Sequence, residues 1–210
     1  MAQDDTAFLA LAQVIAAGDE AAAFRMLAAS PELATTSLAR GATRQATKTY
    51  RLDPIGHYLY AGQTALHVAA AAYHCDIIRQ LIAMGADIRA RDRRGAEPLH
   101  YAAAGTPGSR TWNPDAQAAT IAQLIAAGAD PSAVNMDDVT PLHRAVRTRC
   151  AAAVRALLDG GADPRARNGH GSTPVDLATR NTGRGGSGSP QAKAQQAEIV
   201  RLLKQHGVMR

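Results

Sequence analysis

The feature that most constrains the fold of this chain is a repeated pattern with a fixed spacing. Four similar stretches stand at 62–71, 95–104, 138–147 and 171–180, and they read GQTALHVAAA, GAEPLHYAAA, DVTPLHRAVR and GSTPVDLATR. Their reference positions are 33, 43 and 33 residues apart, counted on Leu66, Leu99, Leu142 and Val175. A repeat with this period is one supersecondary unit, and one copy carries ten additional residues.

Each copy has the pattern of two short helices. A threonine before the first helix serves as N-cap in most copies, and proline follows it in the first helical turn. The second helix places Ile77, Ile78, Leu81 and Ile82 on one buried side, with Val154, Leu157 and Leu158 as counterparts. Glycines are expected to end these helices with positive φ, at Gly85, Gly128 and Gly161. No copy can bury its apolar face alone, so neighbouring copies must stack.

The repeated residues resemble the ankyrin repeat. The matching positions are Thr64 to His67, Pro98 to His100, Thr140 to His143, Thr173 to Val175 and the three Gly-Ala-Asp ends. The resemblance is strong over 60–210 and weaker over 6–35. It implies an all-α ankyrin-repeat solenoid of about five helix-turn-helix repeats with short β-hairpin turns. It also implies a scaffold that binds other proteins.

The expected organisation is one domain over 1–210 in which the end repeats act as caps with polar outer faces. An N-terminal capping repeat, 6–35, is followed by an inserted segment, 36–61, that should lengthen the β-hairpin turns. Plain repeats are expected at 62–94 and 138–170. The repeat at 95–137 carries an inserted loop, 105–114, and the C-terminal capping repeat at 171–210 carries another, 182–193.

The two inserted loops are expected at one edge of the repeats. There they suggest a basic, glycine-lined site for a small anionic or phosphate-bearing ligand. Its residues would be Arg110, Trp112, Arg149 and Arg184. Two alternatives remain open: the glycine-rich loop is a flexible spacer, and Trp112 plugs its own loop. Arg149 and Tyr73 stand where the repeat normally has glycine, so both are expected to adopt a conformation that glycine prefers.

The resemblance also implies where a partner protein would bind: the concave face, the turns and the inserted loops. The variable positions there are Tyr60, Gln63, Arg93, Arg94, Met136, Asp137, Arg147, His170 and Arg180. An acidic partner segment would suit the arginines. Binding of RNA or single-stranded DNA through arginine and aromatic side chains is a weaker alternative, because acidic residues are interspersed.

The sequence favours neither catalysis nor a metal site. His67, His100 and His143 recur once per copy, so they cannot converge on one ion; the resemblance implies that they hydrogen-bond to the main chain of neighbouring repeats. No nucleophile-and-base set is recognisable, and no cofactor is expected. We therefore expect a non-enzyme.

Composition narrows the setting only slightly. The net charge of +5 and pI of about 9.6 permit an acidic partner without requiring one. Two cysteines without a paired framework, and no apolar run of membrane-spanning length, favour a cytoplasmic protein that does not enter membranes. The expected state is a monomer, and the Ala/Arg/Gly bias suggests a bacterial source.

Overall fold

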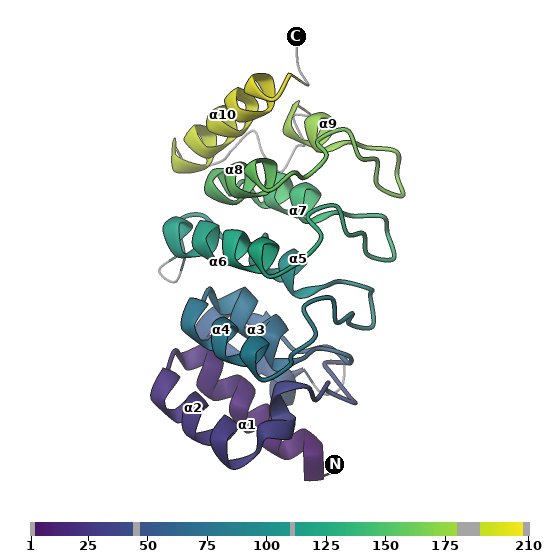
Figure 1. Cartoon of the computed structure of the whole chain (residues 1–210). Coiled ribbons are helices and arrows are strands. Elements are labelled where there is room, and N and C mark those ends of the chain that lie inside the picture. Colours follow the sequence, from purple (N-terminus) through teal and green to yellow (C-terminus); the bar gives the residue numbers. More distant parts are fainter. Residues whose placement is uncertain (1–2, 44–46, 110–111, 180–189, 208–210) are drawn as a thin grey trace. The chain divides into compact units, whose positions relative to one another are not determined.

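The computed structural model describes residues 3–43, 47–109, 112–179 and 190–207. These residues form two compact units, 1–101 and 102–210. Most elements are helices that pack in antiparallel pairs joined by extended turns (Figure 1). The predicted all-α fold of paired helices is therefore confirmed.

Unit 1 holds two helix pairs and the inserted segment. The first pair is α1 (Gln3–Ala17) and α2 (Glu20–Ala29), followed by the 3-10 helix η1 (Pro31–Ala34). The second pair is α3 (Ala65–Ala72) and α4 (Cys75–Ala83), and α5 (Pro98–Ala102) begins the next repeat. Side chains of both pairs meet in one core, where Phe8, Leu11, Leu66, Ile77 and Leu81 have no exposed surface. This core joins α1 to α3 and α2 to α4.

The inserted segment does more than lengthen a turn, which corrects the expectation for 36–61. It contains η2 (Lys48–Tyr50), η3 (Asp53–Ile55) and a short antiparallel pair, β1 (Arg51–Leu52) with β2 (His57–Tyr58). Its buried leucines pack into the unit, and it is fastened to α1 by two hydrogen bonds. Gln13 Nε2 donates to the Arg51 carbonyl at 3.0 Å. Asp5 Oδ1 accepts from the Ala39 amide at 3.2 Å.

Unit 2 contains α6 and two further helix pairs. Its helices are α6 (Pro114–Ala126), α7 (Pro141–Thr148), α8 (Ala151–Asp159), α9 (Pro174–Thr179) and α10 (Pro190–Gln205). The second helices α6, α8 and α10 pack in series through buried Leu124, Leu157 and Leu203. Helix α10 begins at Pro190, so the last four residues expected in the loop 182–193 are helical instead. Proline suits the first helical turn, and glutamine, alanine and lysine continue the helix well.

Capping boxes fix the start of α3 and α7 and link each of these two helices to the repeat that follows it. The Thr64 amide donates to His67 Nδ1 at 3.1 Å, which leaves Nε2 to donate to the Ala96 carbonyl at 3.1 Å. His143 does the same with the Thr140 amide at 3.2 Å and the Ser172 carbonyl at 2.9 Å. The structural role expected for these histidines is confirmed, because both rings are buried and act as neutral imidazoles.

We predict that His143 contributes pH-dependent stability. Burial lowers the pKa of His143 below its usual value and nearby Arg147 lowers it further, against a smaller opposing effect of the Ser172 carbonyl. The neutral ring therefore stabilises the fold fully above the unfolded-state pKa of about 6.5, and this contribution is lost as the pH falls through the folded-state pKa. NMR should show His143 titrating below its peptide value. His143→Gln should flatten the fall in unfolding free energy on acidification; an unchanged fall would contradict the prediction.

In each plain repeat, the turn that joins the first helix to the second places a bulky residue in the left-handed region. Tyr73 has φ 62° and Arg149 has φ 60°, each as the C-cap of a first helix. This confirms the conformation expected at both positions. The predicted glycine positions behave likewise, since Gly85, Gly128 and Gly161 all have positive φ. Side chains with a Cβ rarely adopt this conformation, so Tyr73 and Arg149 are held in it by the turn.

Arg149→Gly should stabilise unit 2 by about 0.5–1 kcal/mol, because glycine adopts the left-handed conformation without steric cost. The matched control is Arg147→Gly, which places glycine inside α7 and should destabilise by about 1 kcal/mol. Urea unfolding measures both. Equal destabilisation by the two changes would show that Arg149 makes contacts that outweigh its strained backbone.

Candidate interaction surfaces

Three tight turns between repeats share one hydrogen-bond pattern, and we call them the finger turns: 91–95 in unit 1, and 134–138 and 167–171 in unit 2. In each turn a side-chain oxygen accepts two backbone amides. Asp92 Oδ1 accepts from Arg94 at 2.8 Å and Ala96 at 2.9 Å. Asn135 and Asn168 repeat this pattern with distances of 2.9–3.0 Å. The turn backbone is thus fixed, and the side chains at its tip are presented to solvent.

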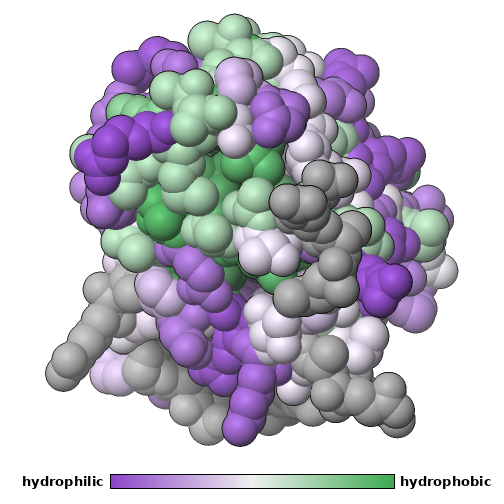
Figure 2. Space-filling view, turned by 90° about the horizontal axis from the view of Figure 1, so that it is seen from below, coloured by the Kyte–Doolittle hydropathy of each residue, from purple (hydrophilic) through white to green (hydrophobic). Residues whose placement is uncertain are grey.

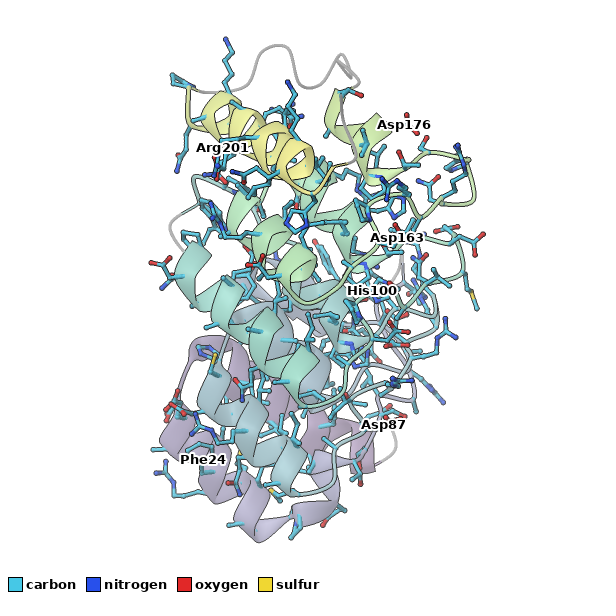
Figure 3. The ribbon with its side chains drawn as sticks, turned by 45° about the horizontal axis from the view of Figure 1, so that its top comes forward. Phe24, Asp87, His100, Asp163, Asp176 and Arg201 are labelled. Carbon is cyan, nitrogen blue, oxygen red and sulfur yellow. The ribbon has the colours of Figure 1, made fainter. Side chains whose placement is uncertain are left out.

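Most of the predicted partner-binding residues in the described structure lie at these tips. Arg93, Arg94, Asp137 and His170 are exposed, and Met136 is 75% exposed, which makes it the most exposed large apolar side chain described. Beside Met136, Val134 is 40% exposed. In Figure 3 the side chains with nitrogen and oxygen crowd around the turn segments that include Asp87 and Asp163. The sequence signal for the tips is the Asp or Asn that recurs at 92, 135 and 168.

In unit 1 the inserted segment and the finger turn form a joint surface. The guanidinium of Arg93 lies over the Tyr60 ring at 4.6 Å, and the Arg93 amide donates to the Ala61 carbonyl at 2.8 Å. Gln63, however, is wholly buried, so its expected role as a partner contact is wrong. Its Oε1 accepts from the Tyr60 amide at 3.3 Å, because the inserted segment folds over it.

Behind this surface lies a buried polar cluster centred on Asp92 and Tyr101. The Tyr101 hydroxyl donates to Asp92 Oδ2 at 2.5 Å, and the Tyr101 ring packs edge-on against His57 and His67. Burial by itself would raise the pKa of Asp92, but the hydrogen bonds from Tyr101, Ala96 and Arg94 outweigh it and hold the pKa below its usual value. The carboxylate is therefore charged and fully engaged in shaping the finger turn. It is not poised for proton transfer.

The inserted loop of the 95–137 repeat is fastened by its own residues. Trp112 Nε1 donates to Gln117 Oε1 at 2.9 Å, and Gln117 Nε2 donates to the Ala102 carbonyl at 2.9 Å. Asn113 caps α6 by accepting from the amides of Asp115 and Ala116. These contacts favour the alternative in which Trp112 plugs its own loop.

A glutamine replaces the plain turn in both inserted repeats. In the plain repeats, the backbone amides of His74 and Cys150 donate to the Ala69 and Ala145 carbonyls at 3.1 and 3.0 Å. Ala102 and Ala178 occupy the equivalent positions in the inserted repeats. There the donors are the side-chain amides of Gln117 and Gln196, which stand where the plain repeats have His74 and Cys150. Sequence analysis missed this role, although a glutamine seven residues before Leu124 and Leu203 was its signal.

The residues of the predicted anion edge are only partly described. Arg110, Arg180 and Arg184 lie outside the described residues. Arg147 is exposed at the end of α7, and Arg149 is half-buried at the adjacent turn. Gly108 of the first loop lies close to Gln191 at the start of α10, since a Cβ on Gly108 would stand 3.3 Å from Gln191 Oε1. The first loop and the start of α10 therefore lie close together, while residues 182–189 of the second loop lie outside the described residues.

A shallow groove that the sequence did not predict lies between α6 and α8. Its volume is about 650 Å³, and alanines of both helices form most of its lining. Arg155 at its side is paired with Glu198 of α10 at 2.6 Å. Within the described ranges, no three His, Cys, Asp or Glu side chains are grouped to hold a metal ion. The same residues include no helix with the length and hydropathy needed to cross a membrane.

Gln117→Leu should destabilise unit 2 by about 1–3 kcal/mol, because it leaves the buried Ala102 carbonyl without its donor. The Trp112 indole also loses the acceptor that holds it in place. The ring should therefore become more exposed to water, and the fluorescence of this single tryptophan should shift to longer wavelength. Urea unfolding and emission spectra measure the two effects. Exposed Gln205→Leu is the control and should change stability by less than about 0.5 kcal/mol. Equal effects of the two changes would contradict the assigned role.

Comparison with known proteins agrees with this geometry. One model of ankyrin repeats (3 copies) matches residues 16–109, and another of ankyrin repeats (many copies) matches residues 124–178. A stretch of 47 residues, 22% of this chain, is 49% identical to the NF-kappa-B inhibitor cactus of Drosophila yakuba and to that of Drosophila melanogaster. The match spans only 10% and 9% of those relatives. The two models together cover most of the chain and share its paired helices and turns, so the chain belongs to the ankyrin repeat family.

Proposed function

We propose that this chain is a non-catalytic scaffold that binds another protein through the tips of its finger turns. The observation that carries the proposal is the exposure of Met136, Arg93 and Arg94 on turns whose backbone is already fixed. An exposed apolar side chain on a preorganised turn loses little conformational freedom on binding, and such residues often dominate interfaces.

The two units offer different chemistry to a partner. In unit 1, Arg93 lies over the Tyr60 ring and exposed Arg94 follows it in the turn, so an acidic segment with an aromatic or aliphatic neighbour fits best. In unit 2, the tip 134–138 combines the apolar Met136 and Val134 with Asp137. An apolar pocket with a donor at its rim would fit this tip. The chain therefore suits a partner that presents both an acidic and an apolar surface.

Family membership and the relatives support a binding role. Ankyrin repeats serve generally as interaction modules, and both matched models are of ankyrin repeats. The two similar proteins carry the name NF-kappa-B inhibitor, a role that a binding protein without catalysis can fill. The alternative of a small anionic ligand at the loop edge has less support, because Trp112, its expected anchor, is hydrogen-bonded to Gln117.

Affinity purification from the source cells, followed by quantitative mass spectrometry, tests the proposal. Proteins retained by the wild-type chain should drop at least about ten-fold with Arg93→Glu/Arg94→Glu or with Met136→Ala, the loss expected for interface hot spots. Arg79→Glu is the control, since Arg79 is also exposed but belongs to α4 and not to a finger turn. The proposal fails if the finger variants retain the same proteins as the wild type.

A further inference from the structure

The outer side of α1 is unusually apolar for a terminal helix. Two of its polar side chains are bonded to the inserted segment: Asp5 accepts from the Ala39 amide, and Gln13 donates to the Arg51 carbonyl. Among the described side chains, the side of α1 away from the core includes Ala10, Val14 and Ala17, which are exposed or half-exposed, together with exposed Thr6 and Gln13. A repeat that ends a stack needs a polar outer face, whereas small apolar side chains form much of the described outer side of α1.

Helix α2 continues this apolar surface. Ala22, Met26 and Ala29 lie along α2 at helical spacing and are exposed or half-exposed. Figure 2 looks onto this end of unit 1, and apolar residues gather over α1 and α2 as a continuous patch. We call this surface the N-terminal face. An apolar patch of this kind marks an interaction site more often than a single exposed apolar residue does.

The N-terminal end of the chain is acidic, whereas the rest of the chain is basic. Residues 1–35 contain five carboxylates and only one base, Arg25, a net charge of −4 in a chain whose total is +5. The remaining residues therefore carry +9. Two of the carboxylates, Asp19 and Glu32, are exposed close to the ends of α2. A partner surface with small apolar side chains and basic residues would complement the N-terminal face in both respects.

The outer stripe of α10 has that composition. Ala194 and Ala197 are exposed, and Lys193 and Lys204 are exposed on the same side of the helix. Ile199, Leu202 and Leu203 are buried on the opposite side. Arg201 adds a further cation on the outer stripe, although Glu198 holds it in an ion pair. The small side chains permit close approach of another helix, and the lysines can pair with Asp19 and Glu32.

We propose that two copies of this chain associate head to tail, with the N-terminal face of one copy packed on α10 of the next. This contact is independent of the finger turns and departs from the monomer expected from the sequence. Face-to-face pairing of two N-terminal faces is disfavoured, because it would bring two regions of net −4 together. A head-to-tail contact uses two different surfaces, so each added copy presents a surface that can receive a further copy.

The contact should be weak and sensitive to salt. Helix α1 has 15 residues and is therefore about 22 Å long, and two helices side by side make a face about 20 Å wide. This is at the small end of specific interfaces, so we expect dissociation constants in the micromolar range. The pairing of exposed charges weakens as salt screens them, which should lower the affinity further.

Sedimentation velocity of the full chain over a wide concentration range tests the proposal. The mass of the wild type should rise with concentration and fall back in high salt. Val14→Asp, which blocks the N-terminal face, and Lys193→Glu/Lys204→Glu, which blocks α10, should each remain at the monomer mass. Arg79→Glu, outside both surfaces, should associate like the wild type. Circular dichroism confirms that each variant is folded.

A mixture of the two blocked variants gives the sharpest result. The intact α10 of the Val14→Asp chain can receive the intact N-terminal face of the other variant, so the mixture should form dimers and nothing larger. A wild type that stays monomeric at all concentrations would overturn the proposal. So would association that Val14→Asp abolishes and Lys193→Glu/Lys204→Glu leaves intact, because that result indicates pairing of two N-terminal faces.

Discussion

The carbonyl groups at the end of each first helix must find a donor, and the remaining structure depends on how they do so. In the plain repeats, a left-handed turn at Tyr73 or Arg149 brings the next backbone amide onto that carbonyl. The same turn starts the second helix in the direction that lets it stack on its neighbours. A buried carbonyl without a donor costs about 1–3 kcal/mol, so an insertion at this place must supply a substitute.

The inserted repeats supply it from the second helix. Gln117 reaches back to Ala102 and Gln196 to Ala178, and both second helices begin several residues earlier than α4 and α8 do. The inserted residues therefore do not have to form a tight turn at this place. Trp112 then donates to Gln117, which gives the tryptophan a structural role in this alanine-rich helical chain. The hydrogen bonds of Trp112 and Asn113 in this loop are made within its own repeat.

Features that depend on residues close together in the sequence could be predicted, and features that depend on distant residues could not. Threonine caps, helix-ending glycines and buried histidines depend on residues within a few positions, and they recur with the repeat, so they were predictable. The roles of Gln63, Gln13 and Asp5 depend on how 36–61 folds back over α1, and no other copy contains such a segment for comparison. Gln117 was hidden for another reason, because its role appears only when the two inserted repeats are compared with the two plain ones.

The finger turns, the inserted loop and the end helices differ in structure. The finger turns combine a fixed backbone with exposed side chains, the inserted loop is bound to its own scaffold, and the end helices differ in charge and polarity. The most direct test of the central claim is a double-mutant cycle with a shortened chain, in which residues 105–114 are deleted and Ala116 becomes glycine to restore the plain turn. In this chain the amide of residue 117 should reach Ala102, so Gln117→Leu should cost little there but about 1–3 kcal/mol in the full chain. An equal cost in both chains would show that the glutamine does not replace the turn.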